Sequence, residues 1–152
     1  MHIWIDGDGC PVIPETIRLS REFSVPCTIL CDTSHIFHRD GAETILCDKG
    51  ADSVDFALAN LACPGDLVVT QDYGLAAMCL SRGAIPLHQD GFVYSEENIG
   101  GLLEARAFSH KVRRSGGRLK GPKKRTGRQD QTFSAALRQL LEEAVQNAER
   151  DR

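Results

Sequence analysis

The sequence lacks the features that mark membrane proteins, secreted proteins and zinc proteins. No apolar stretch approaches the roughly 20 residues that a bilayer-spanning helix needs, and no basic segment followed by an apolar one suggests a secretory leader. The six cysteines form none of the close C-x-x-C pairs typical of structural zinc sites. We therefore expect a cytoplasmic protein with buried free thiols and no membrane partner.

Histidine is not arranged in any pattern that catalysis commonly uses. The five histidines, at positions 2, 35, 38, 88 and 110, show no spacing that suggests a catalytic triad or a zinc site. No internal repeat or low-complexity tract is present either. The absence of a histidine motif suits a hydrolysis that needs no protein nucleophile, in which bound cations activate a water molecule.

Length and patterning favour one α/β domain. With 152 residues, of which 41% are apolar, the chain can build one hydrophobic core but is too short for two ordinary domains. Short apolar runs alternate with amphipathic helical patterns, which predicts a three-layer fold: a mostly parallel sheet of about five strands flanked by helices. Residues 1–109 should form this domain. Residues 110–152 should add a basic, glycine-rich segment and an amphipathic helix that packs on the same domain.

Turn residues and apolar spacing locate the expected elements. Strands are expected at residues 2–5, 27–31, 44–47, 67–70 and 84–87, and helices at 14–23, from 52 or 53, after 72, from 95, and from 130 or 132. The segment between the last two helices is too rich in glycine and charge to be predicted as a regular element. The apolar face of the final helix must dock on the domain.

Carboxylates follow the predicted strands at the positions where parallel sheets bind ligands. Asp6 and Asp8 come directly after the first strand, Asp72 follows the fourth, and Asp55 stands where the helix between them opens. Parallel strands bind ligands at their carboxyl ends, in the crevice where the strand order reverses. Like charges gathered there would repel one another without a cation, and hard oxygen ligands favour Mg²⁺ or Mn²⁺. The sequence therefore predicts that these four aspartates are catalytic and bind one or two such ions.

Other polar residues are predicted to support these ligands, and each acid also has a purely structural explanation. The supporting residues are expected to be Asp52, Thr70, Asp32, Ser34 and His35. Asp52, Asp55 and Asp72 stand where helix capping and the helix dipole also favour acids. Residues 6–9 could serve turn chemistry alone, and Asp32 could belong to a plain loop.

Acidic residues are absent from residues 111–128, which carry nine Lys and Arg. Residues 1–110 hold six Lys and Arg against 16 Asp and Glu, so the formal net charge of -3 conceals a block of +9 beside an acidic part of -10. Such a block would neutralise several phosphates, which predicts single-stranded or structured RNA as its partner. The predicted contacts are Lys111, Arg113, Arg114, Arg118, Lys120, Lys123, Lys124, Arg125 and Arg128. The alternatives are a solvated loop, or a strap that folds over the domain's own acidic surface.

Several motifs in combination resemble a known family. They are Asp6-Gly-Asp-Gly-Cys-Pro11, Asp32-Thr-Ser-His35, Asp52-Ser-Val-Asp55, Gly65-Asp-Leu-Val-Val-Thr-Gln-Asp-Tyr-Gly-Leu-Ala76, and Gly121-Pro122 with Phe133. Over essentially the whole length, they resemble the YaiI/YqxD family of bacterial proteins. The resemblance implies a PIN-like fold with an acidic metal pocket of the ribonuclease type. It also implies that Asp6, Asp55 and Asp72 are acids of that pocket.

Three functions are compatible with these residues. The first is a Mg²⁺- or Mn²⁺-dependent PIN-like ribonuclease or other nucleic-acid-processing protein. The second is a phosphohydrolase of the haloacid-dehalogenase type, with Asp6 as nucleophile and Asp8 as general acid, because an apolar strand ending in Asp-x-Asp also resembles those enzymes. The pocket lysine that they need is not evident. The third is a non-catalytic RNA-binding module. The sequence leaves the oligomeric state open.

Overall fold

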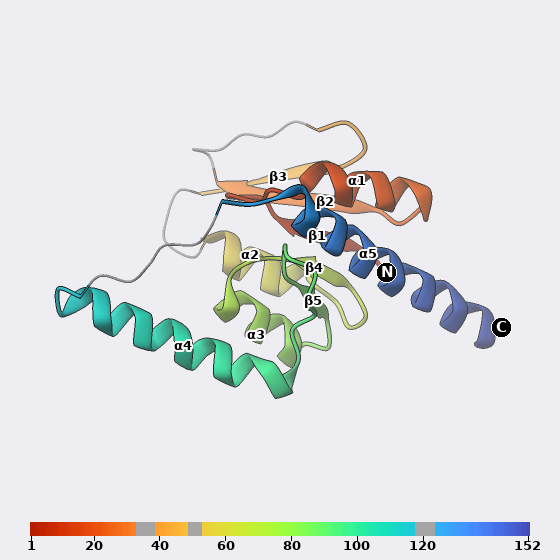
Figure 1. The fold of residues 1–152 in the computed structure, drawn as a ribbon. Helices are drawn as coiled ribbons and strands as arrows, with labels where there is room; N and C mark the ends of the chain where they lie inside the picture. Colours follow the sequence, from red (N-terminus) through yellow and green to blue (C-terminus); the bar gives the residue numbers. More distant parts are fainter. Residues whose placement is uncertain (33–38, 49–52, 118–123) are drawn as a thin grey trace.

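The computed structural model describes residues 1–32, 39–48, 53–117 and 124–152, which contain five strands and five helices (Figure 1). In chain order these are β1 (Ile3–Asp6), α1 (Ile13–Glu22), β2 (Cys27–Asp32), β3 (Glu43–Cys47), α2 (Ser53–Leu61), β4 (Leu67–Val69), α3 (Tyr73–Ser81), β5 (Ile85–Leu87), α4 (Glu96–Arg114) and α5 (Gly127–Arg150). The predicted α/β fold class is confirmed, and the arrangement is consistent with a three-layer PIN-like fold. Among the residues described, no helix is long and apolar enough to cross a bilayer.

β1 lies at the centre of the sheet. The strand order is β3-β2-β1-β4-β5, and all four neighbouring pairs are parallel. After β3 the chain crosses to the other side of β1 to form β4, so the strand order reverses between β1 and β4. Ile5 pairs with Val69 across this boundary, and both strands end at the same edge. This edge is the switch point at which parallel sheets bind ligands.

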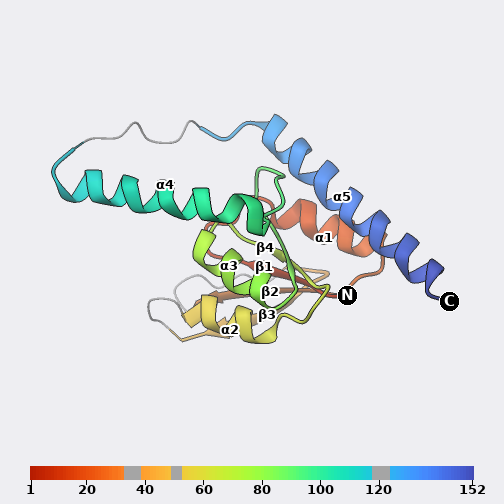
Figure 2. The ribbon, with the colours of Figure 1, turned by 90° about the horizontal axis from the view of Figure 1, so that it is seen from below.

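Two hydrophobic cores, one on each face of the sheet, explain why the strands are apolar on both faces. Ile3 and Ile5 belong to the core that includes α1 and α5, whereas Trp4 packs against the core of α2 and α3. Figure 2 shows α1 and α2 on opposite sides of the sheet. Because successive strand residues alternate between faces, Asp6 projects to the same side as Trp4, toward α2.

α5 packs on α1 and closes one face of the domain. Phe133, Leu137 and Leu141 are at most 1% exposed, and the burial of each side chain stabilises the docked helix by about 1.5 to 3 kcal/mol. Arg138 adds a bidentate ion pair, donating to both carboxylate oxygens of Glu22 at 2.6 and 2.9 Å. Exposed ion pairs contribute little free energy, so the main effect of this pair is to orient α5 on α1.

α4 is longer than expected. The basic segment is predicted to be irregular from its start, but α4 continues through Arg114, so Lys111 and Arg113 are helical. Cations are favoured in the last turn of a helix because they interact with its dipole. The helix ends before Gly116, whose positive φ of 85° breaks the regular conformation. The domain boundary expected after residue 109 falls inside this helix.

α5 begins earlier than expected, at Gly127 rather than at Asp130 or Thr132. The Gln129 side chain accepts a hydrogen bond from the backbone N–H of Thr126 at 2.8 Å. A Thr followed three residues later by Gln is a typical N-terminal signature of a helix, and this local bond outweighs the low helix propensity of the glycine.

The six cysteines are free thiols, as expected, although not all of them are buried. The buried ones are Cys27, Cys31, Cys47 and Cys79. Cys63 is exposed and Cys10 is half-buried. Burial raises the pKa of Cys10 to about 11 and that of Cys79 to about 12, so both are protonated and unreactive at neutral pH.

Candidate functional site

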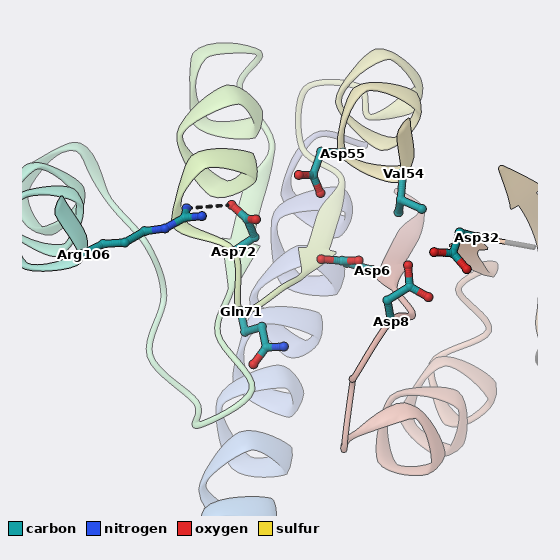
Figure 3. Close-up of a pocket in the computed structure, with 8 residues that line it drawn as sticks. All are labelled: Asp6, Asp8, Asp32, Val54, Asp55, Gln71, Asp72 and Arg106. Atoms are coloured by element: carbon teal, nitrogen blue, oxygen red, sulfur yellow. Dashed lines mark hydrogen bonds and ion pairs between the residues drawn. The ribbon is translucent and has the colours of Figure 1, made fainter. Parts of the chain in front are cut away.

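An acidic pocket of about 320 Å³ lies at the switch point of the sheet (Figure 3). Its lining residues are Asp6, Asp8, Asp32, Val54, Asp55, Gln71, Asp72 and Arg106. The five aspartates come from the ends of β1 and β2, the turn after β1, and the starts of α2 and α3. Among the described lining residues, Arg106 supplies the only positive charge. The pocket therefore has an excess of negative charge.

Asp6, the last residue of β1, is held in place by a threonine on the neighbouring strand. Thr70 follows β4 directly, and its Oγ1 donates a hydrogen bond to Asp6 Oδ2 at 2.9 Å. The same Oγ1 accepts a hydrogen bond from the backbone N–H of Asp72 at 3.0 Å. Because Thr70 is only 2% exposed, it fixes the two acids relative to each other across the switch point.

The pKa of Asp6 is raised from 3.8 to about 7. Burial is the main cause, because it disfavours the charged carboxylate, while the hydrogen bond from Thr70 acts in the opposite direction. The charges of Asp55, Asp8 and Asp72 raise the pKa further. These carboxylates are therefore close enough to repel one another, and a cation bound among them would relieve that repulsion.

The turn after β1 directs Asp8 into the pocket. The Gly7 N–H donates to the Leu30 carbonyl at 2.8 Å, which extends the pairing of β1 with β2 by one residue. A Cβ on Gly7 would lie 2.7 Å from Ile29 Cγ2, so this close approach requires glycine. Asp32 is the last residue of β2 and lines the same pocket, so it belongs to a strand end rather than to a loop.

The other two aspartates stand at helix N-termini. Asp55 is in the first turn of α2, and Figure 3 shows its carboxylate above Asp6. Asp72 is the N-cap of α3, and its Oδ1 accepts a hydrogen bond from the Leu75 N–H at 3.0 Å. The same oxygen lies 3.4 Å from Arg106 Nη1. Asp72 therefore has the structural role that its position suggests and also lines the pocket.

The four predicted metal ligands all line this one pocket. The strands that precede the two acids in the prediction are neighbours: β1 ends at Asp6, and β4 comes shortly before Asp72. Of the predicted supporting residues, Thr70 contacts both of these acids and Asp32 lines the pocket. The others lie outside the described residues: Ser34, His35 and Asp52.

Three lining residues are not predicted from the sequence. Val54 and Gln71 each precede a predicted ligand, so their adjacency in the sequence could have revealed them. Arg106 comes from α4, 34 residues after the aspartate that it contacts. No local pattern marks Arg106, because its place depends on how α4 packs against α3.

Asp66, which directly precedes β4, is an acid with a purely structural role. Its Oδ1 accepts from the His2 backbone N–H at 3.0 Å, and its Oδ2 accepts from Trp4 Nε1 at 3.0 Å and from the Cys63 N–H at 2.9 Å. Three protein donors therefore satisfy this buried carboxylate. By contrast, Asp6 accepts a hydrogen bond from Thr70 through its Oδ2 and lines the pocket.

The donor set of the pocket fits a hard divalent cation. All its acidic groups are carboxylates, and oxygen ligands are those that Mg²⁺ and Mn²⁺ prefer. In the part of the chain that the structure describes, no three His, Cys, Asp or Glu side chains stand close enough to form a ready-made metal cage. Mg²⁺ commonly keeps several waters and contacts only one or two carboxylates. An open acidic pocket suits such a hydrated ion.

The basic segment is split between the end of α4 and the start of α5. Its exposed members are Lys111, Arg113, Arg114, Lys124 and Arg128. Three further members lie outside the described residues: Arg118, Lys120 and Lys123. The basic charge that the structure describes therefore lies mainly on helical surfaces rather than on an irregular loop.

Arg125 is the member of this segment that is tied to the domain. Its Nε donates to Asp130 Oδ1 at 2.7 Å, Nη1 to Asp90 Oδ1 at 2.7 Å and Nη2 to the Gln89 carbonyl at 2.6 Å. Burial alone would lower the pKa of Arg125, but the hydrogen bonds to Asp130 and Asp90 raise it. At this residue the structure matches the strap predicted as an alternative to RNA binding.

A comparison with protein families and a comparison with known proteins both give matches over nearly the whole chain. Residues 4–143 match the family described as "Uncharacterized BCR, YaiI/YqxD family". The chain is 52% identical over 143 residues to a UPF0178 protein of Exiguobacterium sibiricum, which covers 94% of this chain and 98% of the relative. UPF0178 proteins of Clostridium acetobutylicum and Enterococcus faecalis are 46% and 43% identical, over 93% and 95% of this chain and 97% and 100% of their own. No solved structure gives a significant match.

Proposed function

The chain belongs to the YaiI/YqxD family of bacterial proteins, as its motifs predict, and we propose that it is a Mg²⁺- or Mn²⁺-dependent ribonuclease with PIN-like architecture. The observation that carries the proposal is the gathering of five aspartates at the switch point, with the pKa of Asp6 raised to about 7. Crowded carboxylates around a half-buried acid cost stability, and such costs concentrate at functional sites.

In this proposal the protein's residues bind and orient the reacting groups. Asp6, Asp8, Asp55 and Asp72 would hold one or two cations, and Asp32 would add a further carboxylate. When bound, such an ion lowers the pKa of a water molecule and polarises the phosphate. Thr70 keeps two of the acids in register, and burial of its hydroxyl makes that register rigid.

The haloacid-dehalogenase-type alternative is less well supported. Such an enzyme needs an ionised Asp6 as nucleophile, but a metal ligand must be ionised too, so the raised pKa of Asp6 does not separate the two functions. It also needs a pocket lysine, and the described lining residues contain an arginine instead. Trapping of a covalent phosphoenzyme at Asp6 would support this alternative over a nuclease.

RNA is the proposed substrate because the chain separates its charges. The pocket is acidic, while Lys111, Arg113 and Arg114 expose a cluster of positive charge on α4. A polyanion needs cations along its backbone to approach a carboxylate pocket. The same surface would serve a non-catalytic RNA-binding module, so cleavage has to be tested separately from binding.

Asp6→Asn provides the test of cleavage. We expect the unmodified chain to cleave end-labelled single-stranded RNA with added Mn²⁺ and not with EDTA. The cleavage rate of Asp6→Asn should be at least about 100-fold lower, which is the usual effect of removing one electrostatic catalytic contact. Asp40→Asn is the matched control, because it makes the same chemical change at an exposed site outside the pocket.

The result has three informative outcomes. Loss in Asp6→Asn with full activity in Asp40→Asn supports the nuclease. Equal activity in both variants means that the cleavage comes from another site or from a contaminant. Mn²⁺-independent binding of RNA without cleavage by any preparation favours the binding module.

A further inference from the structure

A second cavity, of about 420 Å³, runs along α4 and meets the acidic pocket at Arg106. Its described lining residues are Leu103, Arg106, Ala107, Ser109, His110 and Arg113. None of these is acidic, whereas five of the eight residues of the neighbouring pocket are aspartates. Two cavities of opposite character therefore share one arginine.

Arg106, His110 and Arg113 form a row on one face of α4. They stand at positions i, i+4 and i+7, which lie above one another on a helix surface. The row extends over about 10 Å, because each residue advances a helix by about 1.5 Å. Figure 3 shows Arg106 directed at Asp72, so this face of α4 begins at the acidic pocket.

The rest of α4 leaves this row accessible. The helix has no buried residue, and Figures 1 and 2 both show its C-terminal part projecting past α3 and beyond the body of the domain. Exposed Lys111 and Arg114 follow on the same helix. Positive charge on an element that contributes little to the core is available for a partner.

Arg106 is held only loosely by its own protein. Its Nη1 lies 3.4 Å from Asp72 Oδ1, which is long for a charge-assisted hydrogen bond. Its side chain is 57% exposed, against 30% for that of Asp72. A guanidinium carries five N–H donors, so Arg106 retains donors for a phosphate oxygen while it stays beside the aspartate.

We propose that Arg106, His110 and Arg113 form a phosphate track that leads a single RNA strand from the acidic pocket along α4. This inference rests on the proposed ribonuclease function, since it assigns a path to that enzyme's substrate. Arg106 binds the phosphate next to the one in the pocket, and Arg113 binds a phosphate farther along. The charge of the row is complementary to phosphate, and Arg106, which lines both cavities, points to a strand that occupies both.

The track predicts how binding depends on salt. Each phosphate contact to a single strand contributes about 0.7 to the slope of log affinity against log salt concentration. In an Asp6→Asn background, which prevents cleavage, Arg106→Gln and Arg113→Gln should each lower the magnitude of this slope by about 0.7 for a fluorescein-labelled oligouridine followed by anisotropy. The double variant should lower it by about 1.4, because the two sites contact different phosphates.

Two control variants separate the track from general charge effects. Arg18→Gln removes the same charge from an exposed site on α1, which covers the opposite face of the sheet from α2 and α3, and should leave the slope unchanged. Arg106→Lys keeps the charge and should restore the slope. All variants should melt within about 2 °C of their parent, because substitutions at exposed positions away from special features change stability little.

The outcomes distinguish the track from the function on which it rests. Metal-dependent cleavage together with unchanged slopes in Arg106→Gln and Arg113→Gln would overturn the track and leave the ribonuclease standing. Reduced slopes in both variants, without cleavage by the unmodified chain, would overturn the ribonuclease and leave the track as a binding surface. Slopes reduced equally by Arg18→Gln would overturn the track, because the effect would then be one of net charge alone.

Discussion

Asp6 makes the stability of the protein depend on pH. Its pKa is about 7 in the folded chain against 3.8 for a free carboxyl, so between these values the folded state holds a proton that the unfolded chain has released. The free energy of unfolding of the metal-free protein should therefore fall as pH rises from about 4 to about 7. Asp6→Asn has no charge to bury, so it should be more stable than the parent by about 1 to 4 kcal/mol at pH 8.

Urea unfolding in EDTA across this pH range measures the difference. The two proteins should converge below about pH 3, where Asp6 is protonated in both the folded and the unfolded state. Asp40→Asn should run parallel to the parent at every pH, because Asp40 is exposed. A parent as stable as Asp6→Asn at pH 8 would show that the pocket does not disfavour the charged carboxylate.

Substitution of Thr70 should change both the stability of the protein and the pKa of Asp6. Thr70→Val keeps the shape of the side chain but removes the donor to Asp6 and the acceptor for the Asp72 N–H. The loss should cost about 1 to 3 kcal/mol in the free energy of unfolding, because buried polar groups lose a partner. The pKa of Asp6 should rise further, since the Thr70 hydrogen bond now lowers it.

Urea unfolding and an NMR titration of the Asp6 carboxyl carbon measure these two effects of Thr70→Val. Thr70→Ser is the matched control, because it keeps the hydroxyl and should titrate like the parent. A Thr70→Val protein with parental stability and an unchanged Asp6 titration would contradict the role assigned to this hydroxyl.

At the scale of elements, Arg125 joins the start of α5 to the turn between β5 and α4. Arg125→Gln removes the cation that lies between Asp90 and Asp130, so we expect the free energy of unfolding to fall by about 1 to 3 kcal/mol. Lys124→Gln, at the exposed neighbouring position, should change it by less than about 0.5 kcal/mol. Equal stability of the two variants, measured by urea unfolding, would remove the strap role from Arg125.

The sheet and most of its helices could be predicted because their signals are local. The apolar runs of β2 and β4 are buried on both faces, and β1 is buried on one face and half-buried on the other, which is typical of central parallel strands. Once the strands are parallel, their carboxyl ends share one edge, and the crossover that places β4 beside β1 then brings Asp6 and Asp72 to one pocket. Asp55 could be found because a helix that leads from one parallel strand to another starts at that same edge.

The features that the sequence does not reveal depend on packing between distant elements. Arg106 reaches the pocket only because α4 lies beside α3, and periodicity within α4 contains no information about that neighbour. The extension of α4 to Arg114 could not be predicted either. Glycine and charge predict a loop at this point, although the helix dipole also favours basic residues in the last turn of a helix. Residue types therefore predicted the aspartates of the pocket but not Arg106.

At the scale of the whole molecule, the separation of charge in the sequence is kept in space. The described acids of the pocket lie on the sheet edge, and the exposed cations Lys111, Arg113 and Arg114 lie on a helix that projects from the body. Attraction between such regions is screened within about 8 Å at physiological salt. A projecting helix can therefore keep its positive charge free for a partner instead of losing it to the domain's own surface.

The docking of α5 on α1 also bears on how the protein is made in the cell. The ribosome makes α1 before α5, and Ile13 and Ile17 of α1 are covered in the finished protein by a core that includes Phe133 and Leu137. More than a hundred residues separate α1 from α5, so a growing chain holds this apolar surface uncovered until α5 has been made. During that interval the nascent protein is open to chaperones and proteases, which recognise exposed apolar segments.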